Sequence, residues 1–120
     1  MGQVVLKGKG DIHEITEFLT EQMIGLTCNL SHKIHREIGM NEFVLLIFEK
    51  HFIRNNSRAS LTVLINRDSD ELIVDVIGSG GGTGLIFNFS WGANTDFAHK
   101  VSEILNSKGF QILSENACSY

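Results

Sequence analysis

The sequence predicts an α+β domain, an antiparallel β-meander of about five to six strands with two helices packed on one face. Two segments, one towards each end of the chain, repeat apolar residues at helical intervals. The long central part instead alternates apolar and polar residues with a period of two, which is typical of strands with one buried face. Short polar turns separate these strands, and strands joined in this way usually pair with each other.

The N-terminal part predicts a strand followed by a capped helix. Residues 3–7 form a short apolar run that ends in a loop containing two glycines. Asp11 and Glu14 have the spacing of a capping box, with Asp11 as the N-cap. We expect the helix to cover residues 12–24 and to stop at Gly25. Its apolar stripe consists of Ile12, Ile15, Phe18, Leu19, Met23 and Ile24.

Five strands are expected between the helices. They cover residues 26–35, 43–54, 59–66, 71–77 and 85–92. The run from Phe43 to Phe48 is apolar on both faces, which favours a central strand. Polar turns are expected at residues 39–41, 55–57 and 67–70.

The C-terminal part predicts a second helix and a last edge strand. Asn94 or Thr95 is the expected N-cap, Lys108 falls in the last turn, and Gly109 follows the helix end. The apolar stripe of this helix consists of Phe97, Val101, Ile104 and Leu105. Residues 110–113 add the edge strand, and residues 114–120 are expected to fray.

Composition predicts one globular domain over residues 1–120, since 42% of the 120 residues are apolar and the net charge is −4. The ten lysines and arginines are scattered, which argues against a nucleic-acid partner. The sequence has no signal-peptide pattern and no apolar run long enough for a membrane span, so we expect a cytoplasmic protein without a membrane partner. Cys28 and Cys118 form no zinc-type pair, and Cys28 is expected to be buried and inert.

The alternation leaves one sheet face without a covering layer. If Leu61, Val63, Ile65, Val74 and Val76 face the helices, the opposite face receives a second apolar set. That set consists of Phe43, Leu45, Ile47, Ile73 and Ile77. Because large exposed apolar patches usually mark interfaces, we expect a homo-oligomer, and a dimer in the first place.

Glycines gather in residues 78–84, just before the strand expected at residues 85–92. The spacing matches neither the phosphate loop GxxxxGK[ST] nor the dinucleotide fingerprint GxGxxG. A nest of backbone N–H groups for a small molecule or anion stays open, and so does a merely bulged hairpin. The candidate ligand-binding residues are Gly78, Ser79, Gly80, Gly81, Gly82, Asn88, Ser90, Arg54 and Arg58.

An acid–base cluster is the candidate catalytic feature. Glu49 and His51 lie two apart on one strand and share a face, which Asp75 could join across the sheet. His32 and His35 point to opposite faces, and His13 is expected to be solvated on the first helix, so no metal site and no cofactor is expected. The first hypothesis is therefore a non-enzymatic homo-oligomeric binding domain. The alternatives are a small enzyme and a protein–protein interaction module.

Three segments carry a family resemblance: residues 48–63 (FEKHFIRNNSRASLTV), 77–82 (IGSGGG) and 89–93 (FSWGA). Together they resemble an uncharacterised family of short bacterial proteins, a domain of unknown function, over nearly the whole chain. The resemblance implies a small bacterial cytoplasmic α+β domain. It brings no activity, cofactor or catalytic residue.

Overall fold

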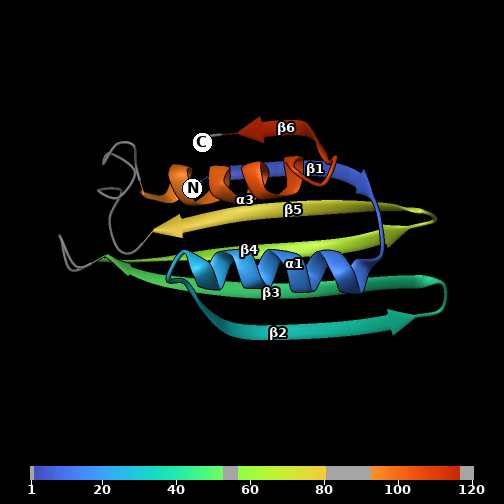
Figure 1. Cartoon of the computed structure of the whole chain (residues 1–120). Helices are drawn as coiled ribbons and strands as arrows, with labels where there is room; N and C mark the ends of the chain where they lie inside the picture. The colour runs from blue at the N-terminus through green and yellow to red at the C-terminus, as the bar shows by residue number, and fades with distance from the viewer. Residues whose placement is uncertain (1, 53–56, 81–92, 117–120) are drawn as a thin grey trace.

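One antiparallel sheet and two helices make up the part of the chain that the computed structural model describes, residues 2–52, 57–80 and 93–116 (Figure 1). The elements in chain order are β1 (Gly2–Lys9), α1 (Ile12–Gly25), β2 (Asn29–Ile38), β3 (Asn41–Phe52), β4 (Ser57–Asp68), β5 (Glu71–Gly80), α3 (Ala93–Asn106) and β6 (Gln111–Asn116). The α+β class with a meander and two helices is confirmed.

The six strands stand in the order β2-β3-β4-β5-β1-β6. Strands β2 to β5 form the expected meander, each pairing with the next in sequence. The first strand lies between β5 and β6 and pairs with both. The two ends of the described chain therefore close one side of the sheet, whereas the β2–β3 hairpin forms the other.

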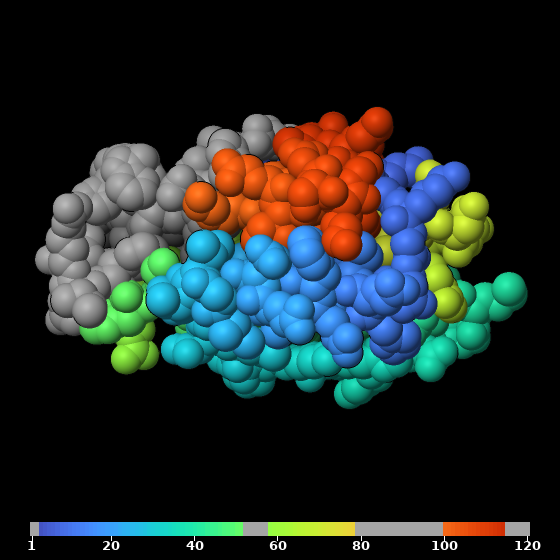
Figure 2. All heavy atoms as spheres, in the orientation of Figure 1, coloured from blue at the N-terminus to red at the C-terminus, as the bar shows by residue number. Residues whose placement is uncertain are grey.

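Both helices cover the same face of the sheet, and Figure 2 shows them side by side across it. The residues expected to face the helices are fully buried, since Leu61, Val63 and Ile65 of β4 and Val74 and Val76 of β5 each have 0% exposure. The core further contains Val4, Leu6, Ile12, Ile15, Leu19, Met23, Val44, Leu46, Phe48, Leu72, Val101, Leu105 and Phe110. Hydrophobic burial between the sheet and the helices is the main source of stability.

The first helix begins as its cap predicts. The Asp11 carboxylate accepts hydrogen bonds from the backbone N–H groups of His13 at 3.1 Å and Glu14 at 3.0 Å. Its end differs from the expectation, because Gly25 is the last helical residue and Thr27 adopts the left-handed conformation, with φ 67°. The backbone N–H of Cys28 still bonds the Met23 carbonyl at 3.2 Å. The backbone N–H groups of residues 26–28 thus cap the C-terminal end of α1, so β2 starts at Asn29 and not at residue 26.

The second helix starts and stops slightly earlier than predicted. It begins at Ala93, so Asn94 and Thr95 lie in its first turn and neither is the N-cap. It ends at Asn106, which leaves Lys108 beyond its last turn. Gly109 has the left-handed φ of 92° that favours glycine after a helix end.

The chain after α3 is more regular than expected. Strand β6 runs to Asn116, and Ser114 and Asn116 pair with Val5 and Gln3 of β1. Residues 114–116, which we expected to fray, are therefore held in the sheet. The turn around residues 55–56, the strand at residues 85–92 and Cys118 fall outside the described residues. Neither described helix is long and apolar enough to cross a membrane.

A close contact fixes the position of β6 against β1. Gly8 lies beneath the buried ring of Phe110, and a Cβ at Gly8 would stand 2.5 Å from the Cγ of that ring. We expect Gly8→Ala to lower the free energy of unfolding by about 1–3 kcal/mol, because the ring has to move out of a packed site. Urea denaturation followed by circular dichroism measures the change.

Gly25→Ala is the matched control, because a Cβ there meets nothing within 4 Å and Gly25 belongs to a helix. It should leave the free energy of unfolding unchanged or raise it by up to about 1 kcal/mol. Equal stability of Gly8→Ala and the wild type would show that Phe110 does not fix this corner.

Candidate functional site

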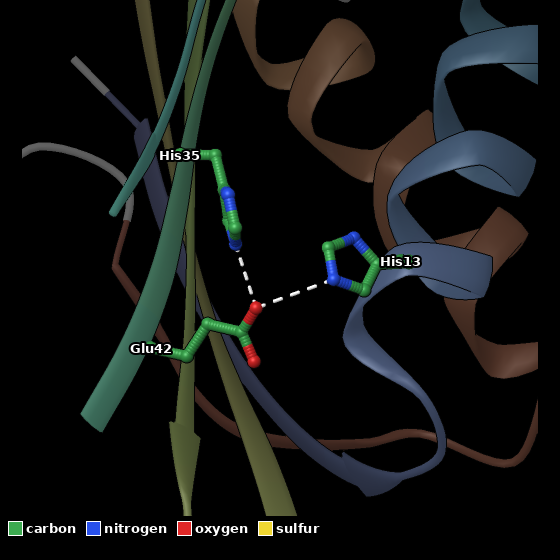
Figure 3. Close-up of side chains that lie close together, drawn as sticks. All are labelled: His13, His35 and Glu42. Atoms are coloured by element: carbon green, nitrogen blue, oxygen red, sulfur yellow. Dashed lines mark hydrogen bonds and ion pairs between the residues drawn. The ribbon is translucent and has the colours of Figure 1, made fainter. Parts of the chain in front are cut away.

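Four polar side chains from four elements meet at one end of the sheet, on the face covered by α1. His13 comes from the first turn of α1, His35 from β2, Glu42 from β3 and Arg67 from β4. We call them the Glu42 cluster. Figure 3 shows the two imidazole rings pointing at the carboxylate from opposite elements, His35 from the sheet and His13 from the helix above it.

Strand alternation brings Glu42 into this position. On β3 the helix-facing side chains are every second residue, Val44, Leu46 and Phe48, and Glu42 continues that row. Its side chain is only 3% exposed, although an ionisable group at such a position is rarely buried unless it is paired. The strand register supplies one partner directly, because Arg67 lies opposite Glu42 on β4.

The carboxylate of Glu42 uses both of its oxygens. The Arg67 guanidinium donates from Nη1 to Oε1 at 2.9 Å. The other oxygen, Oε2, lies 2.6 Å from His35 Nε2 and 3.3 Å from His13 Nε2. A carboxylate only accepts hydrogen bonds, so the Nε2 atom of His35 carries the proton and donates it. The buried charge is thereby compensated by donors from Arg67 and His35, and the His13 ring lies beside the same carboxylate.

The two histidines also contact each other. Their ring centroids lie 5.1 Å apart with an interplanar angle of 62°, an edge-on arrangement. The side chain of His13 is 63% exposed and that of His35 is 34% exposed, so solvent reaches the imidazoles but not the carboxylate between them. The cluster therefore connects the start of α1 to the sheet through two imidazoles that are partly open to solvent.

The environment lowers the pKa of Glu42 below its ordinary value. The hydrogen bond from His35 is the main cause, and the charges of Arg67 and His13 act in the same direction. Burial acts against them, because it penalises the charged form. The carboxylate consequently stays ionised and keeps its full capacity as an acceptor or as a ligand.

Sequence reasoning found only part of this site. His32 and His35 do face opposite sides of β2, since His32 pairs with Ile47 and His35 with Val44. His13 was expected to be merely solvated, but it lies against Glu42 and His35. Glu42 was missed altogether, and so was Arg67. The sequence does contain a signal for both residues, because each falls in the alternation of the buried side chains of its strand and therefore points towards the core.

The predicted acid–base residues do not converge. Asp75 lies opposite Leu64, which lies opposite Leu45, four residues before Glu49 on β3. Four residues along a strand and two strand spacings separate the Cα atoms of Glu49 and Asp75 by about 16 Å. His51 lies farther still from Asp75 along the same strand, opposite Arg58. The three residues do lie on the same face of the sheet, as predicted. The strand register nevertheless keeps Asp75 beyond hydrogen-bond distance of Glu49 and His51, so the small-enzyme hypothesis loses its basis.

The predicted ligand-binding residues of the glycine-rich segment begin at the C-terminal end of β5, away from the Glu42 cluster. Gly78, Ser79 and Gly80 form the end of that strand, where they pair with Leu61, Ser60 and Ala59. The glycine-rich segment thus starts as paired strand and not as a loop. Arg58 is exposed at the start of β4. The remaining candidates, Gly81, Gly82, Asn88, Ser90 and Arg54, fall outside the described residues.

Cys28 is buried as predicted, with 3% exposure. Burial raises the pKa of its thiol, which keeps it in the protonated and less nucleophilic form.

Comparison with known proteins identifies a family and no activity. The family described as "Family of unknown function (DUF6054)" matches residues 1–109, which confirms the resemblance to an uncharacterised family. A bacterial origin stays a prediction. No curated protein matches the chain. Among solved structures, the vertebrate conserved region of human METTL16 is 11% identical over 77% of this chain and 70% of that chain, with a TM-score of 0.47. A likeness at this level carries no information on function.

The lowered pKa of Glu42 predicts how stability depends on acid. At a pH above the ordinary glutamate pKa of 4.5, the ion pairs of the carboxylate stabilise the folded state. This contribution is lost as the pH falls through the lowered pKa that Glu42 has in the folded protein. We expect Glu42→Gln to be less stable than the wild type at neutral pH and to lose less stability on acidification. Urea denaturation at a series of pH values measures both effects.

Glu49→Gln on the same strand is the control, because Glu49 is exposed. It should keep the wild-type acid profile. Parallel profiles for Glu42→Gln and the wild type would mean that the cluster contributes nothing to the acid dependence.

Proposed function

We propose that this chain, which belongs to the DUF6054 family of unknown function, is a non-enzymatic homo-oligomeric binding domain that dimerises through the open face of its sheet. The open face is the one opposite α1 and α3, which both lie on the other side of the sheet (Figure 1). The observation that supports dimerisation is the group of half-buried apolar side chains that strand pairing places side by side on this face.

Residues that pair across neighbouring strands form rows on the open face, perpendicular to the strands. The middle row is Ile34 of β2, Leu45 of β3, Leu64 of β4, Asp75 of β5 and Val5 of β1. All five are half-buried by their neighbours within the sheet. The rows on either side add the half-buried apolar residues Phe43, Ile47, Ile73 and Ile77, with Asn66 and Thr62 of β4 between them. The apolar part of this face gains free energy when a second layer removes it from water, whereas burial of Asp75 opposes that gain.

The size of the open face suits a dimer. Six strands at about 4.8 Å spacing make it about 24 Å wide, and eight residues at about 3.3 Å make it about 26 Å long. The resulting projected area of about 600 Å² approaches the roughly 800 Å² that each partner buries in a standard interface. A second copy offers the same apolar rows, and an isologous two-fold contact uses one patch on both partners. Two such sheets then form a sandwich with helices on both outer faces.

A small ligand or partner is proposed at the glycine-rich end of β5. Gly78 lies there as a buried residue that pairs with Leu61 of β4 and with Gly2 of β1, and Gly80 pairs with Ala59 at the end of the strand. The exposed Arg58 precedes Ala59, the strand partner of Gly80. A cation beside a glycine-rich strand end favours an anionic ligand.

Native mass spectrometry and light scattering after size exclusion test the dimer. We expect a dimer for the wild type at micromolar concentration and a monomer for Leu64→Lys, because each copy would bury a long charged side chain in place of leucine, and an ion pair with Asp75 opposite it offsets only part of the desolvation cost. The far-UV circular dichroism of the variant should stay unchanged, since Leu64 lies outside the core. Any additional mass on the wild-type dimer would give the mass of a bound ligand.

Met40→Lys is the matched control, because Met40 is 90% exposed in the β2–β3 turn. It should remain dimeric. A monomeric wild type would contradict the proposal, and so would equal dissociation of both variants.

A further inference from the structure

We propose that His13, His35 and Glu42 form a binding site for a divalent transition-metal ion, with Zn²⁺ as the preferred occupant. Each of the three residues offers one ligand atom, and these atoms all lie within 4.8 Å of one another. They come from three different elements, α1, β2 and β3, so the ion would join the helix to the hairpin. Two imidazoles and one carboxylate make up a ligand set that occurs in zinc proteins.

The distances between the ligand atoms suit a small ion. Zinc binds imidazole nitrogen and carboxylate oxygen at about 2.0–2.2 Å, so neighbouring ligands of a tetrahedral site stand about 3.3 Å apart. In the Glu42 cluster, His13 Nε2 already lies 3.3 Å from Oε2, and His35 Nε2 lies 2.6 Å from the same oxygen (Figure 3). Each Nε2 becomes a ligand when its proton moves to Nδ1, which changes the tautomer and not the charge of a neutral histidine. A small outward shift of the His35 ring completes the geometry.

Arg67 prepares the carboxylate for this role. Its guanidinium holds Oε1 of Glu42 at 2.9 Å and leaves Oε2 for the ion. Such an outer partner orients a metal ligand and tunes its affinity. The buried position of Glu42 in the core-facing row of β3 restricts its rotamer further. His13 is placed by the first turn of α1, where the Asp11 cap fixes the helix start.

The three residues leave one coordination position open. A shallow cavity of about 140 Å³ adjoins the two histidines, and its remaining lining is Thr16, Glu17, Lys33 and Val44. A site with three protein ligands and an open fourth position takes water or a ligand from solvent. Lys33 and Glu17 bring opposite charges to this lining, so the cavity sets no clear charge preference for the occupant of that position.

The chemistry of the ligands also predicts selectivity. Imidazole nitrogen suits Zn²⁺ and its transition-metal neighbours, whereas Mg²⁺ and Ca²⁺ require several oxygen ligands. The nearby positive charge of Arg67 opposes any cation, so the bonds to the two imidazoles have to supply the affinity. We therefore expect Zn²⁺ and Co²⁺ to bind and Mg²⁺ to give no signal.

Isothermal titration calorimetry with Zn²⁺ on the full chain, with any histidine tag removed, tests the site. We expect one ion per chain for the wild type and an affinity at least about 100-fold weaker for His13→Ala, since loss of an outer partner alone costs about 10–100-fold. His13 is largely exposed, so this variant should keep its fold. The visible spectrum of bound Co²⁺ reports the coordination geometry, and Zn²⁺ should raise the melting temperature of the wild type but not that of His13→Ala.

His32→Ala is the matched control, because His32 is an exposed histidine on the opposite face of the same strand as His35. It should bind Zn²⁺ like the wild type. Equal affinity of the wild type and His13→Ala would overturn the site, as would equal loss in His32→Ala or binding of Mg²⁺ with similar affinity. In those cases the cluster is a structural ion pair only.

The metal site and the proposed dimer interface lie on opposite faces of the sheet, so the two proposals fail independently. His13→Ala should stay dimeric, and Leu64→Lys should still bind Zn²⁺.

Discussion

The burial of one sheet face under two helices is the constraint on which the rest of the structure depends. Because successive side chains of a strand point to opposite faces, this one requirement assigns every residue of β3, β4 and β5 to a side. The apolar residues in phase with Leu61 and Val74 form the core. Those in phase with Leu45 and Leu64 lie half-buried on the open face, which is the surface proposed for dimerisation.

Glu42 is the place where this constraint is broken. It occupies a core-facing position but carries a charge, and the fold accepts it because Arg67 stands opposite and His35 and His13 lie against its other oxygen. A pair of well-packed apolar residues at the Glu42 and Arg67 positions would often be equally stable. Stability alone therefore gives no reason for the cluster, whereas cation binding between α1 and the β2–β3 hairpin gives one.

The parts of the fold that follow from local chemistry could be predicted from the sequence. The Asp11 cap and the alternation in β4 and β5 depend on neighbouring residues, and the structure confirms both. The position of β1 between β5 and β6 depends on pairing over long sequence separation, which periodicity does not encode. The same limit applies to the site. His13 meets Glu42 only through tertiary packing, and the offset between Glu49 and Asp75 depends on a register that alternation leaves open.

The β2–β3 hairpin serves both faces of the sheet at once. His35 and Glu42 point towards α1, while Ile34 and Leu45 point to the open face. A slip of one residue in this hairpin would exchange the two sets and disrupt the proposed metal site and the proposed dimer surface together. The turn that fixes the register contains Gly39 with a left-handed φ of 62°, a conformation that glycine adopts without strain. The geometry of both proposed surfaces therefore depends on this short turn, although it belongs to neither.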